Sequence, residues 1–137
     1  LIEEETLAIG VFGGDNIRKT MKKVRVSILP ANQKLPISIE ALVVDTICTE
    51  CIAVPEENVI REMNMMHLDT RALSLQGVED KQIAVLIGSD YYWDIVMGTV
   101  KPVFEKLKAV KTKLGWTVQG PLSTAAHVTQ SASIAVL

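Results

Sequence analysis

The stretch IAVLIGSDYYWDIV, residues 83–96, changes character within a few positions. Five apolar residues run into Gly88, a Ser-Asp pair follows, and three aromatic residues come directly after that pair. The chain holds only six aromatic residues, so half of them lie here. The apolar run predicts a central strand that is buried on both faces and ends at Gly88. Ser89 or Asp90 then caps a short helix that contains the aromatic residues.

The composition is that of a globular domain. The chain has 137 residues, of which 48% are hydrophobic and 22% are charged, and its net charge is -2. This mild acidity gives no reason to expect a nucleic-acid partner or a membrane surface. No apolar run is long enough to cross a bilayer. The chain opens on Leu1 in a sequence that reads as the middle of a longer polypeptide, so we expect it to be a piece of one.

Alternating apolar and polar residues predict short strands in the first half of the chain. The alternation covers residues 7–11, 24–28 and 37–43, and each run is bounded by Gly, Pro, Asn or Asp. This is typical of short strands and hairpins. The sequence PANQ, residues 30–33, predicts the turn between the second and third strands.

The apolar period then changes to that of a helix. Acidic residues follow Pro55, and Val59, Met63 and Met66 have the spacing i, i+4, i+7. This pattern predicts a helix with a methionine-rich core face. Farther along, alternation over residues 110–118 predicts one final strand, with residues 102–110 as a connector.

This order of elements predicts a mainly β, barrel-like domain with one or two short helices. We expect the domain to span residues 1–122, and residues 123–137, which are small and polar, to be a tail or linker.

Two motifs that suggest chemistry are incomplete. The glycine-rich segment Gly10–Gly14 lacks the spacing of a phosphate-binding loop, so it predicts a hairpin tip instead. In LVVDTI, Asp45 resembles the catalytic D-[ST]-G of aspartic proteases, but Ile47 stands where the glycine belongs. Asp45 is therefore either a catalytic candidate or the polar end of a strand.

The two cysteines, Cys48 and Cys51, form a C-x-x-C pair. Such a pair serves in redox chemistry or supplies half of a zinc site. It follows a β-rich run, and the two histidines lie far apart in the sequence. We therefore expect two reduced thiols, no metal and no cofactor, in an intracellular (cytoplasmic) setting.

The sequence resembles the aspartic peptidase domain of BEL/Pao retrotransposon polyproteins. That family carries the blocks LIG-x-D-x-x-W and T-x-LGW-x-x-x-G, and both stand here in VLIGSDYYWDIV and AVKTKLGWTVQGP. The segment LAIGVFGG also resembles the family. The resemblance covers about residues 1–122 and implies a retropepsin-like β-barrel that pairs as a homodimer and cleaves a polypeptide substrate.

The resemblance also implies roles for several groups of residues. It places Gly10, Val11, Phe12, Gly13 and Gly14 in a flap over the substrate, and Leu86, Ile87, Gly88 and Asp90 beneath the catalytic loop. It places Leu114, Gly115 and Trp116 in the strand of the dimer interface. The family's D-[ST]-G precedes LAIGVFGG and is absent from this chain, so we expect no peptidase activity from the chain alone.

Two other interpretations stay open from the sequence. One is a non-catalytic retropepsin-like module that binds peptides or dimerises. The other is a redox or metal module built on the cysteine pair.

Overall fold

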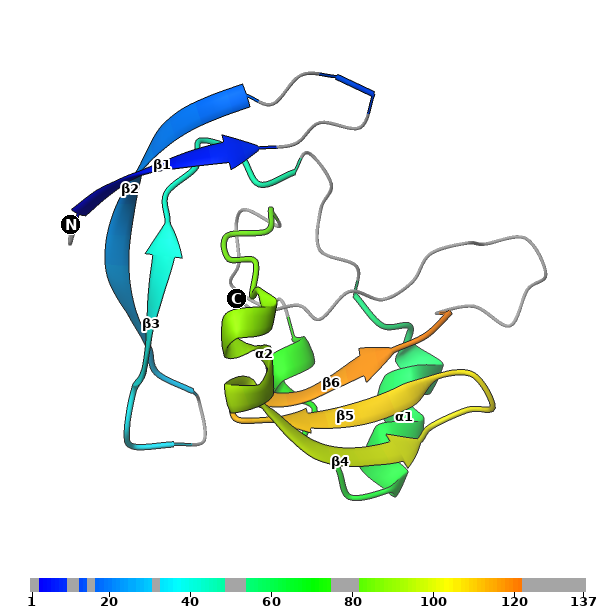
Figure 1. The fold of residues 1–137 in the computed structure, drawn as a ribbon. Coiled ribbons are helices and arrows are strands. Elements are labelled where there is room, and N and C mark those ends of the chain that lie inside the picture. The colour runs from blue at the N-terminus through cyan, green and yellow to red at the C-terminus, as the bar shows by residue number, and fades with distance from the viewer. Residues whose placement is uncertain are drawn as a thin grey trace.

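The computed structural model describes residues 3–9, 13–14, 17–30, 33–48, 54–74 and 82–121. In chain order its elements are β1 (Glu3–Ile9), β2 (Ile17–Ile28), β3 (Ile37–Leu42), α1 (Glu57–Met65), η1 (Arg71–Leu73), α2 (Ser89–Ile95), β4 (Val96–Pro102), β5 (Lys108–Thr112) and β6 (Gly115–Gln119). The strands form two antiparallel three-stranded sheets, ordered β1-β2-β3 and β4-β5-β6 (Figure 1). The predicted mainly β class is confirmed.

The N-terminal sheet is built around β2, which is long enough to pair with a different strand at each end. Its first part pairs with β1, from Ile17 to Lys23, and its second part pairs with β3, from Lys23 to Ile28. At the predicted turn after β2, the amide of Gln33 donates to the carbonyl of Pro30 at 3.2 Å, and the two residues between them lie outside the described residues.

Helix α1 forms where the helical period predicts it. Pro55 is buried just before the helix, and Val59 and Met63 are its buried residues. Helix α1 ends at Met65, Met66 is its C-cap residue, and the following His67 adopts a left-handed conformation with φ 60°. The amide of His67 donates to the carbonyl of Asn64 and that of Leu68 to the carbonyl of Met63, each at 3.0 Å. This pair of bonds is the Schellman motif, which usually has glycine where His67 stands.

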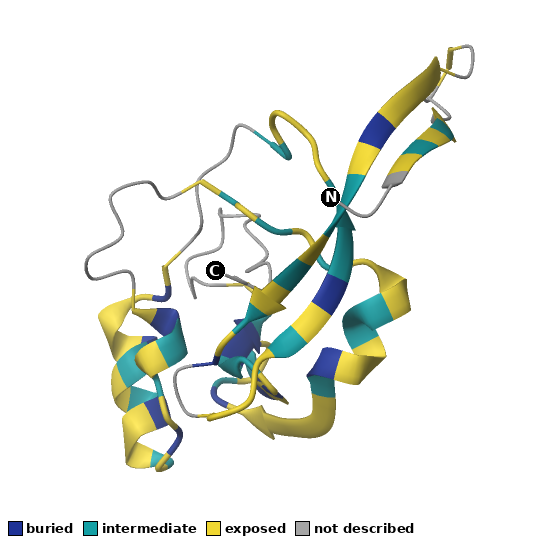
Figure 2. Cartoon of the chain, turned by 90° about the vertical axis from the view of Figure 1, so that its left-hand side faces the viewer, coloured by how far each residue is buried: buried dark blue, intermediate teal, exposed yellow. Residues whose placement is uncertain are grey.

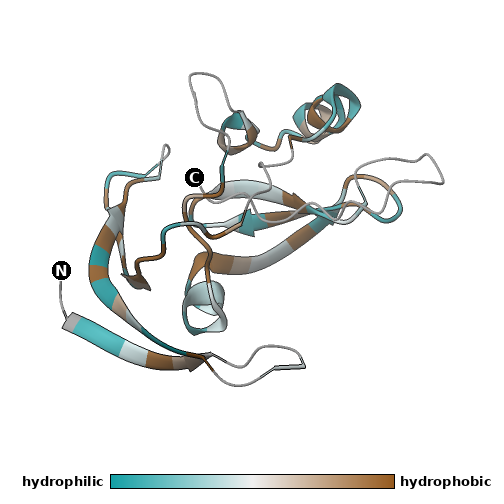
Figure 3. Cartoon of the chain, turned by 90° about the horizontal axis from the view of Figure 1, so that it is seen from above, coloured by the Kyte–Doolittle hydropathy of each residue, from teal (hydrophilic) through white to brown (hydrophobic). Residues whose placement is uncertain are grey.

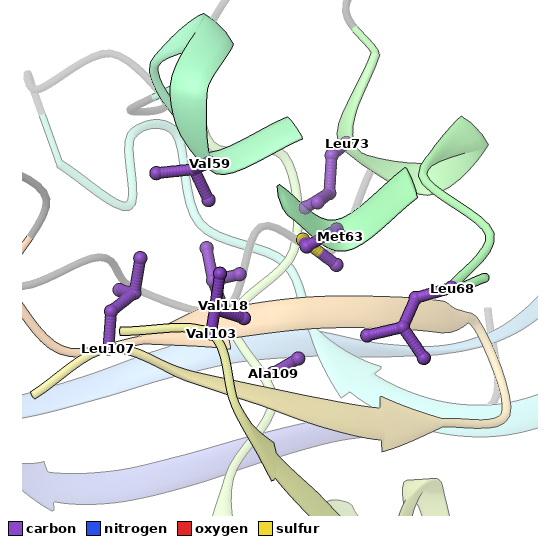
Figure 4. Packing of buried hydrophobic residues seen from close by; sticks show 8 residues of the cluster. All are labelled: Val59, Met63, Leu68, Leu73, Val103, Leu107, Ala109 and Val118. Atoms are coloured by element: carbon purple, nitrogen blue, oxygen red, sulfur yellow. The ribbon is translucent and has the colours of Figure 1, made fainter. Parts of the chain in front are cut away.

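The C-terminal sheet carries the main hydrophobic core, shown in Figure 4. Eight buried residues form this cluster: Val59, Met63, Leu68, Leu73, Val103, Leu107, Ala109 and Val118. In Figure 4, α1 and η1 lie on one side of the cluster, and β5, β6 and the turn between β4 and β5 lie on the other. Helices α1 and α2 lie on opposite sides of this sheet (Figures 1 and 3).

The predicted single strand over residues 110–118 is wrong, because β5 and β6 form a hairpin there. The register pairs Val110 with Thr117 and Ala109 with Val118. Val110 and Thr117 therefore share one face of the sheet, while Ala109 and Val118 share the other face. All four residues are buried, so this hairpin is covered on both sides.

The predicted central strand before Gly88 is also wrong. Residues 83–88 belong to neither three-stranded sheet. Their burial alternates, with Ile83, Val85 and Ile87 half-buried, while the intervening Leu86 is 74% exposed. An extended segment that is covered on one side only exposes every second side chain.

The two sheets are joined by a contact between α2 and β3. The Tyr91 hydroxyl accepts a hydrogen bond from the amide of Glu40 at 3.0 Å. The amides of alternate residues in a strand point to the same side. The amide of Val43 donates to the carbonyl of Lys22, so the odd-numbered residues of β3 point their amides toward β2. The amide of the even-numbered Glu40 therefore points away from β2, to the outer edge of β3. Among the described strands, none of the first sheet pairs with one of the second.

Candidate functional site

The first sequence block, LIG-x-D-x-x-W, forms the start of α2. Gly88 is the N-cap residue, and its carbonyl accepts hydrogen bonds from the amides of Tyr91 at 3.2 Å and Tyr92 at 3.0 Å. The predicted caps, Ser89 and Asp90, are instead the first two helical residues. The carboxylate of Asp90 also accepts from the amide of Tyr91 at 3.1 Å, so the carboxylate and the Gly88 carbonyl share this amide at the helix start.

The side chains of this block differ in where they lie. Ile87 is half-buried, whereas Leu86, Gly88 and Asp90 are exposed. Trp93, which closes the block, is 75% exposed, and its ring packs edge-on against Tyr92 at 5.0 Å between centroids. The three aromatic residues therefore divide into one that binds β3 and two that form a pair on the helix.

The second block, T-x-L-G-W, is the turn between β5 and β6. The hydroxyl of Thr112 donates to the carbonyl of Gly115 at 2.7 Å and accepts from the amide of Leu114 at 3.1 Å. Gly115 has φ +120°, and a Cβ atom there would lie 2.6 Å from the Cβ of Ala72 in η1. Both the backbone conformation and the close packing require glycine. Trp116 packs against the hydrophobic core.

The structure brings these two blocks together. The amide of Lys113, in the β5–β6 turn, donates to the carbonyl of Ile95 at the end of α2 at 2.9 Å. Sequence reasoning did not predict this bond or the Tyr91–Glu40 bond. The T-x-L-G-W block contains the two residues that form the turn, Thr112 and Gly115, but the sequence reasoning did not identify a turn there.

The segment predicted as a flap is only partly described. Gly10, Val11 and Phe12 lie outside the described residues. Gly13 and Gly14 are exposed, and Gly13 has φ +77° with nothing within 4 Å of the position a Cβ would take. These values fit the predicted hairpin tip between β1 and β2. No described contact joins these glycines to α2 or to the β5–β6 turn.

The remaining candidates give no assembled centre. Asp45 is exposed and follows β3 in a bend. Cys48 is half-buried, and Cys51 lies outside the described residues. Within the described ranges, no group of three or more His, Cys, Asp or Glu side chains is placed to hold a metal ion.

One ion pair shifts the titration of its members. The side chain and backbone of Arg71 donate hydrogen bonds to Asp69, and these bonds lower the pKa of the Asp69 carboxyl from its ordinary value. The pair precedes and begins η1, whose Ala72 packs on Gly115.

The chain matches no protein-family model, no curated protein and no solved structure. None of the helices within the described part of the chain is both long and apolar enough to cross a membrane.

Proposed function

We propose that this chain belongs to a retropepsin-like aspartic endopeptidase domain that processes a BEL/Pao-type retroelement polyprotein in the cytoplasm. The observation that carries the proposal is the presence of both family blocks in the family's order, 83–96 and 110–121. The bond from Lys113 to Ile95 supports it, because the helix of one block and the turn of the other adjoin. A mainly β architecture with short helices is compatible with it.

The proposed mechanism is that of an aspartic dyad. One member of the dyad is an ionised carboxylate and takes a proton from a water molecule that attacks the peptide carbonyl, and the other member is a protonated carboxyl group that acts as the acid and protonates the leaving amine. The family places its D-[ST]-G before the segment that resembles LAIGVFGG, so the dyad is assigned to residues preceding Leu7 in the parent polypeptide. Two copies of the domain would each supply one aspartate, in a barrel completed by that additional strand.

The residues of this chain would then support the dyad and cover the substrate. Gly88 and Asp90 would fix the start of α2 beneath the catalytic loop, and Gly10–Gly14 would form the flap. Leu114, Gly115 and Trp116 would contribute to the homodimer interface. No cofactor or metal takes part in such chemistry.

The test is a cleavage assay on a longer polypeptide. The parent sequence is extended upstream by about 30–50 residues, which is the room for a strand, a turn and a helix. We expect an apolar-apolar-D-[ST]-G there, cleavage of peptides at acidic pH, and loss of cleavage when its aspartate is changed to asparagine. An intact parent that lacks the motif would refute the peptidase assignment.

The alternative is a non-catalytic module of the same fold that binds peptides or dimerises. The position of Asp45 favours this alternative over catalysis by the chain itself, because Asp45 is exposed in a bend after β3 and is followed by Ile47 where the D-[ST]-G motif has glycine. Cleavage by the 137-residue chain that Asp45→Asn abolishes would instead identify Asp45 as catalytic.

A further inference from the structure

The β1–β2 hairpin separates its paired charges from its unpaired ones. Near the hairpin's base, the ammonium of Lys23 lies 3.6 Å from the carboxylates of both Glu5 and Glu40, and Arg25 lies 3.4 Å from Glu40. These charges neutralise one another. Figure 3 shows hydrophilic and hydrophobic residues interspersed along the same strands.

Toward the tip of the hairpin, the strand register places uncharged residues opposite the cations of β2. Arg18 is paired with Ala8 and Lys19 with Leu7, so neither cation has an acidic residue across the strand. Both are exposed, and neither forms an ion pair with a described residue. The sequence between the two strands holds one acid, Asp15, which lies outside the described residues. Figure 2 shows this end of the hairpin extending away from the rest of the chain.

The same part of β2 has an open edge. Strand β3 pairs with β2 from Lys23 onward, and the last described bond on that side runs from the amide of Val43 to the carbonyl of Lys22. In an antiparallel strand the amide and carbonyl of alternate residues point to the same side. Arg18 and Thr20 therefore direct their backbone groups to the side that no described strand covers.

We propose that this edge binds an extended acidic segment of polypeptide by strand addition. The backbone groups of Arg18 and Thr20 would pair with the added strand, as exposed sheet edges do in peptide recognition. Because Arg18 and Lys19 point to opposite faces, they would bind carboxylates of two consecutive residues of that strand. The inference extends the proposed function by naming the kind of polypeptide, since the hairpin is the element assigned to the flap.

The test is equilibrium binding to the 137-residue chain, followed by fluorescence anisotropy. The probe is a fluorescein-labelled peptide, Thr-Val-Glu-Glu-Val-Thr, at 50 mM salt. The double variant Arg18→Gln/Lys19→Gln is expected to bind about ten-fold more weakly, from two exposed ion pairs. The matched control Lys101→Gln/Lys111→Gln removes two exposed lysines of the other sheet, so it makes the same change in net charge and is expected to bind like the unchanged chain.

Strand addition is tested separately from charge. Thr20→Pro removes the outward amide and is expected to weaken binding about ten-fold, whereas Thr20→Ala keeps that amide and is expected to change binding less than two-fold. A probe whose two glutamates are replaced by glutamine should bind weakly to every variant. A probe N-methylated at alternate residues keeps its charge and should also bind weakly, which tests the edge without altering the protein.

Three results would overturn the inference. These are equal losses in the two double variants, no difference between the glutamate and glutamine probes, and tighter binding of a uridine ten-mer RNA than of the peptide. Because the readout is binding, these results leave the peptidase proposal standing. Failure of the longer polypeptide to cleave peptides overturns that proposal and leaves the binding result intact.

Discussion

Replacing Thr112 with valine is expected to destabilise the chain by about 2 kcal/mol. Thr112 is buried, and its hydroxyl both donates to the carbonyl of Gly115 and accepts from the amide of Leu114. Valine keeps the shape of the side chain but leaves both partly buried backbone groups without these bonds. Each hydrogen bond contributes about 1 kcal/mol net, so their loss gives about 2 kcal/mol.

The assay is urea unfolding followed by the fluorescence of Trp116, which packs against the core. Trp93 is 75% exposed, so Trp93→Phe serves as the background that removes its signal. With a slope of about 1.5 kcal/mol per molar urea, the midpoint should fall by about 1.3 M at an unchanged slope.

Thr117 provides a matched control for this substitution. It is as buried as Thr112 and lies on the neighbouring strand, but among the described contacts its hydroxyl forms no hydrogen bond. Thr117→Val should therefore change stability by less than about 0.5 kcal/mol. Equal shifts for Thr112→Val and Thr117→Val would refute the reasoning that the hydroxyl bridge holds the turn.

Three further predictions follow from single contacts. Tyr91→Phe should cost about 1 kcal/mol, because the partly buried amide of Glu40 loses its acceptor, and urea unfolding measures this. His67→Gly should stabilise the chain by up to about 1 kcal/mol in the same assay, because the left-handed conformation strains histidine and not glycine. The lowered pKa of Asp69 means that its bonds to Arg71 stabilise the folded state above the ordinary carboxyl pKa of about 4, and this small contribution should be lost as pH falls below that value.

Each of these three has its own control. Tyr92→Phe removes a neighbouring hydroxyl with no described hydrogen bond and should leave stability unchanged. His67→Ala should give no such gain, because alanine is strained in the same conformation. Asp69→Asn should flatten the acidic part of the stability profile, and an unaltered profile would contradict the assignment.

Helix α1, β3 and parts of β1 and β2 were predictable because one face of each is covered, whereas β4 and the first part of β2 were not predicted. The alternation along β1, β2 and β3 and the spacing of Val59 and Met63 reflect that one-sided burial. When only one face of an element contacts a core, apolar residues recur with the period of that element, about 2 for a strand and 3.6 for a helix. The spacing of apolar residues then identifies the element.

The β5–β6 hairpin was missed because its alternation continues across the turn. Val110 and Val118 are in phase in the sequence, yet the two-residue turn at Lys113 and Leu114 puts them on opposite faces. Both faces of this hairpin are covered, so apolar residues occur on either face. The alternation of apolar and polar residues therefore does not show which face a residue occupies. The turn itself is fixed by the Thr112 side chain and not by an Asn-Gly or Asp-Gly pair, which would have predicted it.

The two sequence blocks of the candidate site could be identified from the sequence, but the contacts that position them in the fold could not. The contact from Tyr91 to Glu40 joins residues 51 positions apart, and it depends on a backbone amide that any residue in β3 supplies. Such a contact requires no particular residue type in β3, so the sequence of β3 does not predict it. Gly115 differs in this respect, because its positive φ and its close approach to Ala72 both require glycine at this position. Its role can therefore be recognised from the residue type in the sequence.

The two motif blocks therefore have a physical basis that does not depend on catalysis. Gly88 and Asp90 begin α2, Thr112 and Gly115 close the β5–β6 turn, and the Lys113–Ile95 bond holds the helix beside the turn. Trp93 is the exception, because it is exposed and nothing in the core requires it. Tryptophan is enriched at the energetic centres of protein–protein interfaces, so the exposed ring of Trp93 is compatible with the proposal that the domain contacts another polypeptide.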